Sequence, residues 1–420
     1  MVGPPEPMTQ AATRADAERL DAGDPLRRFK DAFDLPDGVI YLDGNSLGPL
    51  PKATPARLEE VARTEWGGDL IKSWNKHGWM DYANRLGDKI AGLIGAGEGE
   101  VVVADSTSVN LYKVLSAALR MRPGRTKIVS EIGNFPTDLY IAQGLTGTDS
   151  GHALHMAEKA GIVQAIDGDT AVVSLTQVDY RTGEMHDMAA ITEAAHAAGA
   201  IMVWDLSHSA GAVPVDLNAA NADMAVGCGY KYLNGGPGAP AFLFVAERHQ
   251  NSFEQPLSGW IGHARPFDFL PDYEPADGVS RYLCGTPGII AMAALEVGVD
   301  LMVEADMGAI RRKSIQLSEL FIERVEATCG EFGLELISPR SPEIRGSQAG
   351  FAHPNGYPVM QALIERGVIG DFRAPDILRF GFTPLYLGFA DVWDAVEILR
   401  DVLASGVWTE EKYSRRGMVT

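Results

Sequence analysis

An aspartate and a lysine, each expected at the carboxyl end of an apolar strand, are the residue pair in this sequence most suited to chemistry. Asp205 ends the run AIMVWD, and Lys231 follows 26 residues later in CGYKYLNGGPG, after a second apolar strand. Ligands of open α/β sheets bind beyond this end of the strands. A lysine amine can form a Schiff base with pyridoxal phosphate, while a carboxylate pairs with the pyridinium nitrogen and keeps it protonated. The same two residues are equally typical of a salt bridge or of a solvated loop lysine.

A Ser/Thr cluster and an aromatic turn lie upstream of this pair. Thr107 and Ser108, in DSTSVNLYK, begin a pattern that predicts an amphipathic helix. The free N–H groups and the positive dipole end of such a helix favour a phosphate, although Ser or Thr there is also an ordinary helix cap. Phe135, in NFPTD, could stack on a cofactor ring or pack in the core, and Asp138 could be a simple turn acid.

Three glycine motifs suggest other chemistry but lack its context. GAGEGE (95–100) and GCGYKY (227–232) lack the third glycine of a nicotinamide-binding fingerprint. GNSLG (44–48) has the letters of a serine-hydrolase elbow around Ser46, but Pro49 follows where that elbow must enter a helix. The three cysteines are too few for a disulfide framework and lack metal-ligand spacing, so we expect no metal and a reducing compartment.

The elements that would position these residues alternate between strands and helices. The segments 170–178, 187–198 and 200–205 read as strand, helix and strand, which is one unit of a mostly parallel sheet. The apolar runs at 222–229 and 239–246 are separated by too few residues for a crossover helix. We therefore expect these two strands to be antiparallel neighbours.

The length of the chain and the pattern of apolar residues along it predict two domains preceded by a short segment. The 420 residues exceed what one compact core usually holds. An almost unbroken helical pattern at 291–328 is long enough to connect two domains. We expect residues 1–50 to be an N-terminal segment that contributes to the site. Residues 51–300 would form a large α/β domain with a mostly parallel mixed sheet, and residues 301–420 a smaller α+β domain.

Composition excludes several classes of function. The hydrophobic share of 46% and the charged share of 22% are those of a globular protein. The net charge of −20 repels polyanions, so neither nucleic acid nor an anionic membrane surface is an expected partner. The N-terminus does not read as an export signal, and apolar runs are only strand-length. We expect a soluble, cytoplasmic protein whose anionic ligands would need a locally basic pocket.

Seven motifs make the sequence resemble the kynureninase family. In chain order and within residues 43–386 they are DGNSLGPLP, SWNKHGW, NFPTD, QVDYRTGEMHDM, DLSHSAG, CGYKYLNGGPGAP and RFGFTPLY. The resemblance implies a pyridoxal-phosphate enzyme of the aspartate-aminotransferase (type I) fold that acts as a homodimer. It also implies hydrolysis of the Cβ–Cγ bond of L-kynurenine, or of its 3-hydroxy form, to anthranilate and L-alanine in tryptophan catabolism, a route toward NAD biosynthesis.

The resemblance implies a role for each matching residue. Lys231 would be the Schiff-base lysine and Asp205 the pyridinium partner, with His208 contacting the cofactor. Other positions implied to hold the phosphate or the ring are Thr107, Ser108, Phe135, Asp138, Thr176 and Tyr230. Trp260 and Thr286 match positions that reach the cofactor of the partner subunit.

The resemblance also implies the substrate contacts. Arg379 would clamp the α-carboxylate, a task that suits a planar bidentate donor, although a surface strand arginine is the ordinary alternative. Trp74 would line the aryl pocket or simply pack, and Asn45 and Ser46 would lie in a loop that closes over substrate. Tyr230, next to the lysine, is a candidate proton donor.

Alternative functions stay open on the sequence alone. Another enzyme of the same fold, a cysteine desulfurase or an aminotransferase, is the nearest of them. A desulfurase would use a mobile catalytic cysteine, and neither Cys284 nor Cys329 lies in an evident glycine-rich loop. A serine hydrolase acting through Ser46 and a scaffold without activity are more remote, and both predict a protein without bound cofactor.

Overall fold

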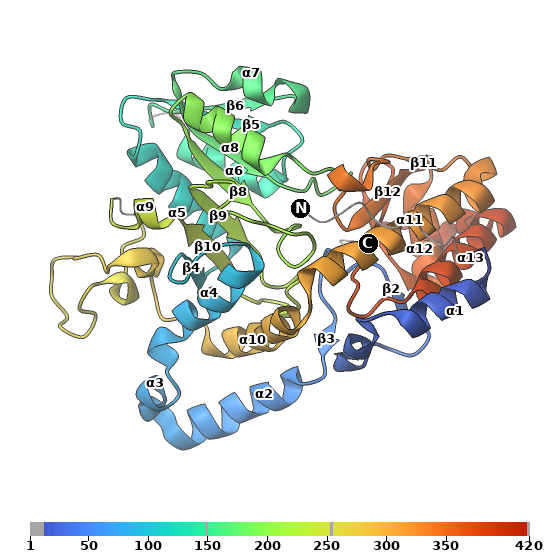
Figure 1. Ribbon diagram of the computed structural model, residues 1–420, viewed down its shortest axis with the longest axis horizontal. Helices are drawn as coiled ribbons and strands as arrows, with labels where there is room; N and C mark the ends of the chain where they lie inside the picture. The colour runs from blue at the N-terminus through green and yellow to red at the C-terminus, as the bar shows by residue number, and fades with distance from the viewer. Residues whose placement is uncertain (1–11, 148–149, 253–254, 418–420) are drawn as a thin grey trace.

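A seven-stranded sheet forms the centre of the larger part of the molecule (Figure 1). The computed structural model describes residues 12–147, 150–252 and 255–417. The strand order is β4 (Val101–Ala104), β10 (Ala241–Val245), β9 (Met224–Gly227), β8 (Ile201–Asp205), β7 (Thr170–Thr176), β5 (Lys127–Glu131) and β6 (Ala153–Ala157). β10 is antiparallel to both its neighbours, and the remaining adjacent pairs are parallel. The expected antiparallel pairing of the apolar runs at 222–229 and 239–246 is confirmed.

Helices cover this sheet because its strands are apolar on both sides. β7 and β8 are buried along their whole length, as expected for strands in the middle of a parallel sheet. Between them runs α8 (Met188–Ala197), which confirms the predicted strand–helix–strand unit. The helix predicted after the Ser/Thr cluster is α5 (Thr107–Arg120), which packs on β9, β10 and β7. The sheet therefore presents the carboxyl ends of its parallel strands, and the start of α5, at one edge.

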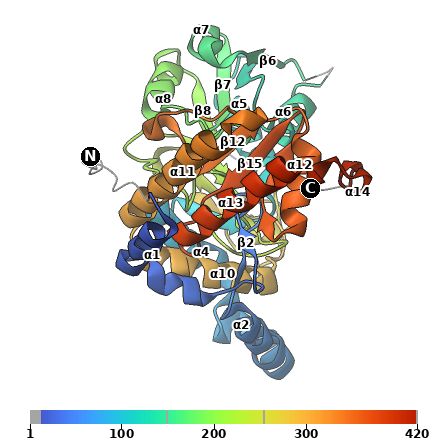
Figure 2. The same cartoon turned by 90° about the vertical axis from the view of Figure 1, so that its right-hand side faces the viewer.

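A second, four-stranded antiparallel sheet lies in the C-terminal part of the chain. Its order is β11 (Glu335–Leu336), β12 (Gln348–Ala352), β15 (Ile377–Gly381) and β14 (Asp371–Arg373). The helices α11 (Met307–Cys329) and α12 (Gly356–Glu365) pack on it, and α13 (Phe389–Ser405) packs on these two helices, as Figure 2 shows from that side. Phe321 of α11 packs its ring 4.7 Å from the ring of Phe380 on β15, which ties helix to sheet.

The N-terminal segment crosses to these C-terminal elements. α1 (Arg14–Gly23) lies against α13, where the blue and red ends of the chain meet in Figure 1. β2 (Ile40–Tyr41) pairs in parallel with β13 (Val368–Ile369), and β1 (Phe33–Asp34) pairs with β3 (Leu50–Pro51). Between β2 and β3, residues 43–48 form a loop that reaches the larger sheet's lysine turn.

The long helical pattern at 291–328 is interrupted, contrary to the expectation of an almost unbroken helix. It forms α10 (Ile289–Glu304) and α11, with Ala305 and Asp306 between them. The Asp306 carboxylate accepts the N–H of Ala309 at 2.6 Å and so caps the start of α11. Aspartate is a strong cap residue because it satisfies an N–H that the first turn leaves unpaired.

The remaining helices are shorter or lie at the edge of the molecule. They are α2 (Thr54–Glu60), α3 (Ser73–Lys76), α4 (Tyr82–Leu93), α6 (Pro136–Leu145), α7 (Ile162–Ala165), α9 (Glu247–Gln250) and α14 (Glu411–Ser414). α2 continues into a stretch of π-helix, Val61–Asp69, which lies at the lower edge in Figure 1. Within the described ranges, every helix is too short or too polar to span a membrane.

Candidate active site

Twelve residues line a cavity of about 290 Å³ at the carboxyl ends of the parallel strands. Nine of them are those that the sequence predicted to touch a cofactor within one subunit: Thr107, Ser108, Phe135, Asp138, Thr176, Asp205, His208, Tyr230 and Lys231. The other three, which sequence reasoning missed, are Thr137, Tyr180 and Ser207. Strand ends far apart in the chain thus bring an amine, two carboxylates, an imidazole and a helix start to one cavity.

Lys231 lies in the turn after β9, against the N-terminal loop. Its Nζ is 5.9 Å from the ring centroid of Phe135 and 5.8 Å from that of Tyr230. The N–H of Gly48 donates to the Tyr230 carbonyl at 2.8 Å. A Cβ at position 48 would collide with the Lys231 carbonyl oxygen and with Asn234, so only glycine permits this close approach.

Two carboxylates meet at the strand end opposite the helix start. Asp205 accepts the N–H of Ser207 at 2.7 Å and its hydroxyl at 2.6 Å, which fixes the orientation of the carboxylate. Asp138 is buried beside it and receives the Thr176 hydroxyl at 3.2 Å. Burial, followed by the charge of Asp205, raises the pKa of Asp138 well above its ordinary value. This environment favours the protonated form of Asp138, which can donate a hydrogen bond.

His208 forms another part of the cavity wall and is only 4% exposed. Its Nδ1 atom is buried without a hydrogen-bond partner. Burial, together with the charges of Lys231, Arg379 and Arg373, lowers the pKa of His208 well below its ordinary value. The cavity thus holds a neutral imidazole whose unused nitrogen could serve a ligand, because a buried polar atom without a partner is costly.

The start of α5 supplies the opposite end of the cavity. Ser106 caps the helix, and its hydroxyl accepts the N–H of Val109 at 3.4 Å. The preceding residue, Asp105, has a φ of +47° and forms an ion pair with the fully buried Lys113. Lys113 also donates to the Tyr282 carbonyl at 2.7 Å. The pair anchors the turn that presents the first N–H groups of α5, which is where an anion binds to a helix.

These groups fit pyridoxal phosphate. A helix start suits its phosphate, the carboxylate end suits its ring nitrogen, and the lysine amine between them suits its aldehyde. The unpartnered Nδ1 of His208 and the half-exposed ring of Phe135 would flank such a ring.

Arg379 lies on β15, next to the cavity, and is 1% exposed. Its Nη1 donates to the carbonyl of Tyr180, which lines the cavity. Its Nε donates to Asp371 Oδ1 at 2.7 Å, and its Nη2 donates to the Ser46 hydroxyl at 2.8 Å. With its amide oxygen turned toward the guanidinium, Asn45 accepts from Nε and Nη2 at 3.0 and 3.1 Å. The three predicted substrate residues of the loop and β15 therefore cluster, and Arg379 is buried rather than a surface arginine.

The surroundings of Ser46 do not match the serine-nucleophile alternative. Its hydroxyl donates to Asp371 at 2.9 Å and accepts from Arg379, so it lies in an ion-pair cluster and not beside a general base. The loop continues into the short strand β3 and not into the helix that a nucleophile elbow requires.

Trp74, Trp260 and Thr286 lie outside the lysine cavity. Trp74 and Thr286 line a separate cavity of about 620 Å³, together with Trp66 and Trp79. The Trp74 ring lies edge-on to the ring of Trp260, 6.4 Å between centroids, and 5.9 Å from that of Trp79.

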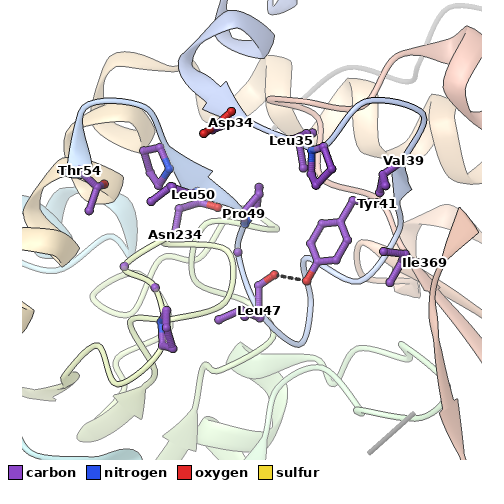
Figure 3. Close-up of a pocket in the computed structure, with 16 residues that line it drawn as sticks. Asp34, Leu35, Val39, Tyr41, Leu47, Pro49, Leu50, Thr54, Asn234 and Ile369 are labelled. Atoms are coloured by element: carbon purple, nitrogen blue, oxygen red, sulfur yellow. Dashed lines mark hydrogen bonds between the residues drawn. The ribbon is translucent and has the colours of Figure 1, made fainter. Parts of the chain in front are cut away.

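A third cavity, of about 330 Å³, borders the loop that carries Asn45 and Ser46 (Figure 3). It lies between the N-terminal segment and the turn after Lys231, and prolines and aliphatic side chains form most of its wall. Tyr41 extends along it and donates its hydroxyl to the Leu47 carbonyl at 2.8 Å. The buried Asn234 Oδ1 at its edge has no hydrogen-bond partner. The loop is therefore held by specific polar contacts rather than by a filled core.

Some of the site residues that the sequence did not predict lie in recognisable sequence motifs, and others do not. Ser207 and Thr137 lie inside the quoted motifs, one or two positions from predicted residues. Asp371 faces Arg379 because the β14–β15 hairpin pairs these two positions directly. The pairing of Asp371 with Arg379 could have been predicted only if the hairpin had been recognised in the sequence. A strand of three residues is too short to show the alternation of apolar and polar residues that identifies a strand.

Comparison with known proteins gives one consistent family. The model of the kynureninase C-terminal domain matches residues 310–399. The kynureninase of Burkholderia pseudomallei (strain K96243) is 55% identical over 414 residues, which cover 97% of this chain and 100% of that relative. The kynureninase of Pseudomonas fluorescens is 54% identical with the same coverage.

Solved structures of lower identity share the fold. The cysteine desulfurase of Thermococcus onnurineus NA1 gives a TM-score of 0.76 at 21% identity and covers 90% of this chain and 98% of its own. A C-DES variant with glycine covalently linked to its PLP cofactor gives 0.75 at 16% identity and covers 87% and 97%. The large mixed sheet and the smaller C-terminal sheet thus confirm the type I fold that was expected from the sequence.

Proposed function

The chain belongs to the kynureninase family and cleaves the side chain of L-kynurenine by hydrolysis with pyridoxal phosphate, and we propose that the lysine cavity of about 290 Å³ is where it does so. One observation carries this assignment. The nine residues expected around the cofactor within one subunit come from separate strand ends and line a single cavity. The products are anthranilate and L-alanine.

The cofactor's contacts follow from the chemistry of the cavity. Thr107 and Ser108 would bind the phosphate at the start of α5, and Asp205 would pair with the ring nitrogen. Lys231 would hold the aldehyde through its amine, and His208 and Phe135 would contact the ring. When bound, pyridoxal phosphate supplies an electron sink that stabilises negative charge on an amino acid joined to it.

The protein's own groups then orient the substrate and move protons. Arg379 binds the α-carboxylate, and Lys231 removes the α-proton once its amine is free. Burial raises the pKa of Tyr230 above its ordinary value, so the phenol keeps its proton at neutral pH. Tyr230 is therefore suited to supply the proton that turns Cβ into the methyl group of L-alanine. Water adds to the γ-carbonyl carbon, the Cβ–Cγ bond breaks, Cγ becomes the carboxylate of anthranilate, and Cβ takes the proton.

We also propose a homodimer in which Trp260 and Thr286 complete the partner's site and Trp74 lines its aryl pocket. Support comes from aromatic side chains near Trp260 that are largely exposed in the single chain. Phe267 is 60% exposed and Phe269 is 79% exposed. Exposed apolar clusters of this kind mark interaction surfaces. Light scattering of the purified protein tests the assembly, and a monomer at micromolar concentration would contradict it.

The domain division, the cellular compartment and the metabolic pathway are further proposals. We propose the division into an N-terminal segment (1–50), a large domain (51–300) and a small domain (301–420); the helix break at Ala305 and Asp306 lies close to the second boundary. We propose a cytoplasmic enzyme in tryptophan catabolism, on a route toward NAD biosynthesis.

The assay that tests the function distinguishes it from its alternatives. Turnover of L-kynurenine should release anthranilate, which is fluorescent, without keto-acid formation. An aminotransferase would instead form a keto acid, and a cysteine desulfurase would release sulfur from cysteine. Release of keto acid without anthranilate would overturn the proposal.

A further inference from the structure

The guanidinium of Arg379 is not an isolated cation. The buried carboxylate of Asp371 already binds one edge of this guanidinium. Asp371 is 2% exposed and accepts from Arg379 Nε at 2.7 Å and also from Nη2. It accepts further hydrogen bonds from Arg373 Nη2 at 2.6 Å and from the Ser46 hydroxyl at 2.9 Å. Asp371 therefore uses both of its oxygens on the two arginines and the loop.

Asp43 is the second carboxylate of this cluster, and it has no arginine of its own. It lies in the loop between β2 and β3, two residues before Asn45, and the carbonyl of the preceding Leu42 accepts the N–H of Gly381 on β15, two residues beyond Arg379, at 2.6 Å. Its Oδ1 atom is buried and has no hydrogen-bond partner. A buried carboxylate oxygen without a donor favours the neutral acid, because burial penalises the charged form.

The ionisable groups around Asp43 come from four places in the fold. They are Tyr41 of β2, Tyr232 after the lysine, Asp371, Arg373 and Arg379 of the β14–β15 hairpin, and Tyr386 beyond β15. Burial raises the pKa of each of these tyrosines, so all three stay neutral. Burial, and then the charge of Asp371, raises the pKa of Asp43 to about 7, against the opposing effect of Arg379. The pKa of Asp371 is lowered by Arg379, so Asp371 stays charged.

The protonation of Asp43 therefore sets the net charge of the cluster. Arg379, Arg373 and Asp371 sum to +1 when Asp43 is protonated (2 − 1) and to 0 when it is ionised (2 − 2). A carboxylate entering beside an ionised Asp43 would meet a like charge in a poorly solvated site. Like charges in a poorly solvated site disfavour each other's ionisation.

We propose that Asp43 is a positioning residue that couples carboxylate binding at Arg379 to uptake of one proton. Substrate or product binds to the form in which Asp43 carries its proton, and solvent supplies that proton when the pH is high. The inference rests on the proposed function, in which Arg379 binds the α-carboxylate.

The test compares two amines that differ only in the carboxylate. L-alanine, the product, carries it, and ethylamine does not. Their inhibition constants against L-kynurenine are measured with the holoenzyme at pH 6 and pH 8. In the wild-type enzyme the ratio of the alanine constant to the ethylamine constant should rise about tenfold, as expected when a group of pKa near 7 must be protonated. In Asp43→Asn, which mimics the neutral acid, the ratio should change less than twofold.

A matched control and a second variant make the result specific. Asp34→Asn removes a nearby carboxylate that lines the neighbouring apolar cavity and should keep the wild-type pH dependence. Arg379→Lys should weaken alanine binding and leave ethylamine binding unchanged. Alanine binding unaffected by Arg379→Lys would overturn the proposed function of Arg379. If Arg379→Lys loses alanine binding but Asp43→Asn keeps the wild-type pH dependence, the proposed role of Arg379 stands. The coupling to Asp43 is then overturned.

Calorimetry on the wild-type enzyme gives an independent readout that needs no variant. Titrations at pH 8 in buffers of different ionisation enthalpy measure the protons taken up on binding. L-alanine should take up close to one proton more than ethylamine. An equal proton count for the two ligands would overturn the coupling.

Discussion

The guanidinium of Arg379 and the carboxylate of Asp371 are paired across adjacent strands β15 and β14, with side chains that are 1% and 2% exposed. The β14–β15 hairpin thereby fixes the direction in which Arg379 offers its remaining N–H group, on Nη1. Ser46 and the Tyr180 carbonyl hold the other edge, so the orientation of the arginine depends on three separate parts of the chain. The proposed binding of the substrate carboxylate at Arg379 should be correspondingly sensitive to these partners.

Asp371→Asn should raise KM more than it lowers kcat. The amide can still accept hydrogen bonds, but the buried charge of Arg379 loses its counterion. The guanidinium also loses the two carboxylate contacts, from Nε and Nη2, that fix its orientation, and we expect this loss to outweigh the gain in positive charge, so that KM for L-kynurenine rises about tenfold. Steady-state kinetics measure both constants. A fall in kcat at unchanged KM would contradict a role in holding the carboxylate site.

Gly48→Ala should lower kcat strongly, because a Cβ there collides with the Lys231 carbonyl oxygen and with Asn234. The loop must then move away from the lysine, and displacements of about 1 Å near reacting groups can cost roughly a hundredfold in rate. Gly23→Ala is the matched control, because a Cβ at that position meets nothing within 4 Å. Equal kcat values for the two variants would show that the loop contact is unimportant.

Lys113→Met should weaken binding of the cofactor. Lys113 is buried beneath the turn before α5 and is paired with Asp105, so its loss frees the turn that begins the phosphate site. A charged hydrogen bond is worth about 1.5–3 kcal/mol, which predicts a Kd for pyridoxal phosphate raised about ten- to hundredfold. Absorbance titration of the apoenzyme measures this Kd. Lys127→Met, which breaks a pair with Asp167 at the start of β5, should leave it within threefold.

Asp223→Asn should reduce stability at neutral pH and have less effect in acid. Asp223 is 2% exposed and accepts from His249 and His196, both at 2.7 Å, and these bonds with the Met202 N–H hold its pKa well below the ordinary value. A lowered carboxyl pKa stabilises the fold above the unfolded value, near pH 4, and this contribution disappears as pH falls further.

The expected loss at pH 7 is about 3 kcal/mol, typical of breaking a buried charged pair. Denaturant unfolding at pH 7 and pH 3.5 measures the difference between the two proteins. The difference in free energy of unfolding between the wild type and Asp223→Asn should be smaller at pH 3.5 than at pH 7. A larger difference in acid would mean that Asp223 is not charged in the folded protein.

Much of the larger sheet could be predicted because its strands are continuous apolar runs separated by helices or by a short glycine-rich turn. The parallel pairing of β7 and β8 and the antiparallel pairing of β9 and β10 both follow from the length of the connection. The grouping of Lys231, Asp205 and Thr107 at one edge follows from the same topology, because parallel strands end on the same side.

Other parts of the site depend on contacts that leave no local pattern. Lys113 sits within an amphipathic helix and reads as a surface lysine, yet the helix is covered on that face as well. The pairing of Asp371 with Arg379 depends on a hairpin of very short strands. The break at Asp306 shows the reverse case, because an aspartate inside a helical pattern was visible and could have been read as a new cap.

We propose that the lysine cavity binds pyridoxal phosphate through Lys231 and that L-kynurenine is hydrolysed there. The most direct measurement is the absorbance spectrum of the purified protein reconstituted with pyridoxal phosphate, before and after L-kynurenine is added, with anthranilate and L-alanine quantified. Wild-type protein should show the visible band of a lysine-bound cofactor and release the two products in equal amounts, and Lys231→Ala should show neither. A Lys231→Ala protein that retained the band and the turnover would show that Lys231 does not hold the cofactor, and a wild-type protein loaded with cofactor that released no anthranilate would show that the cavity does not carry out this hydrolysis.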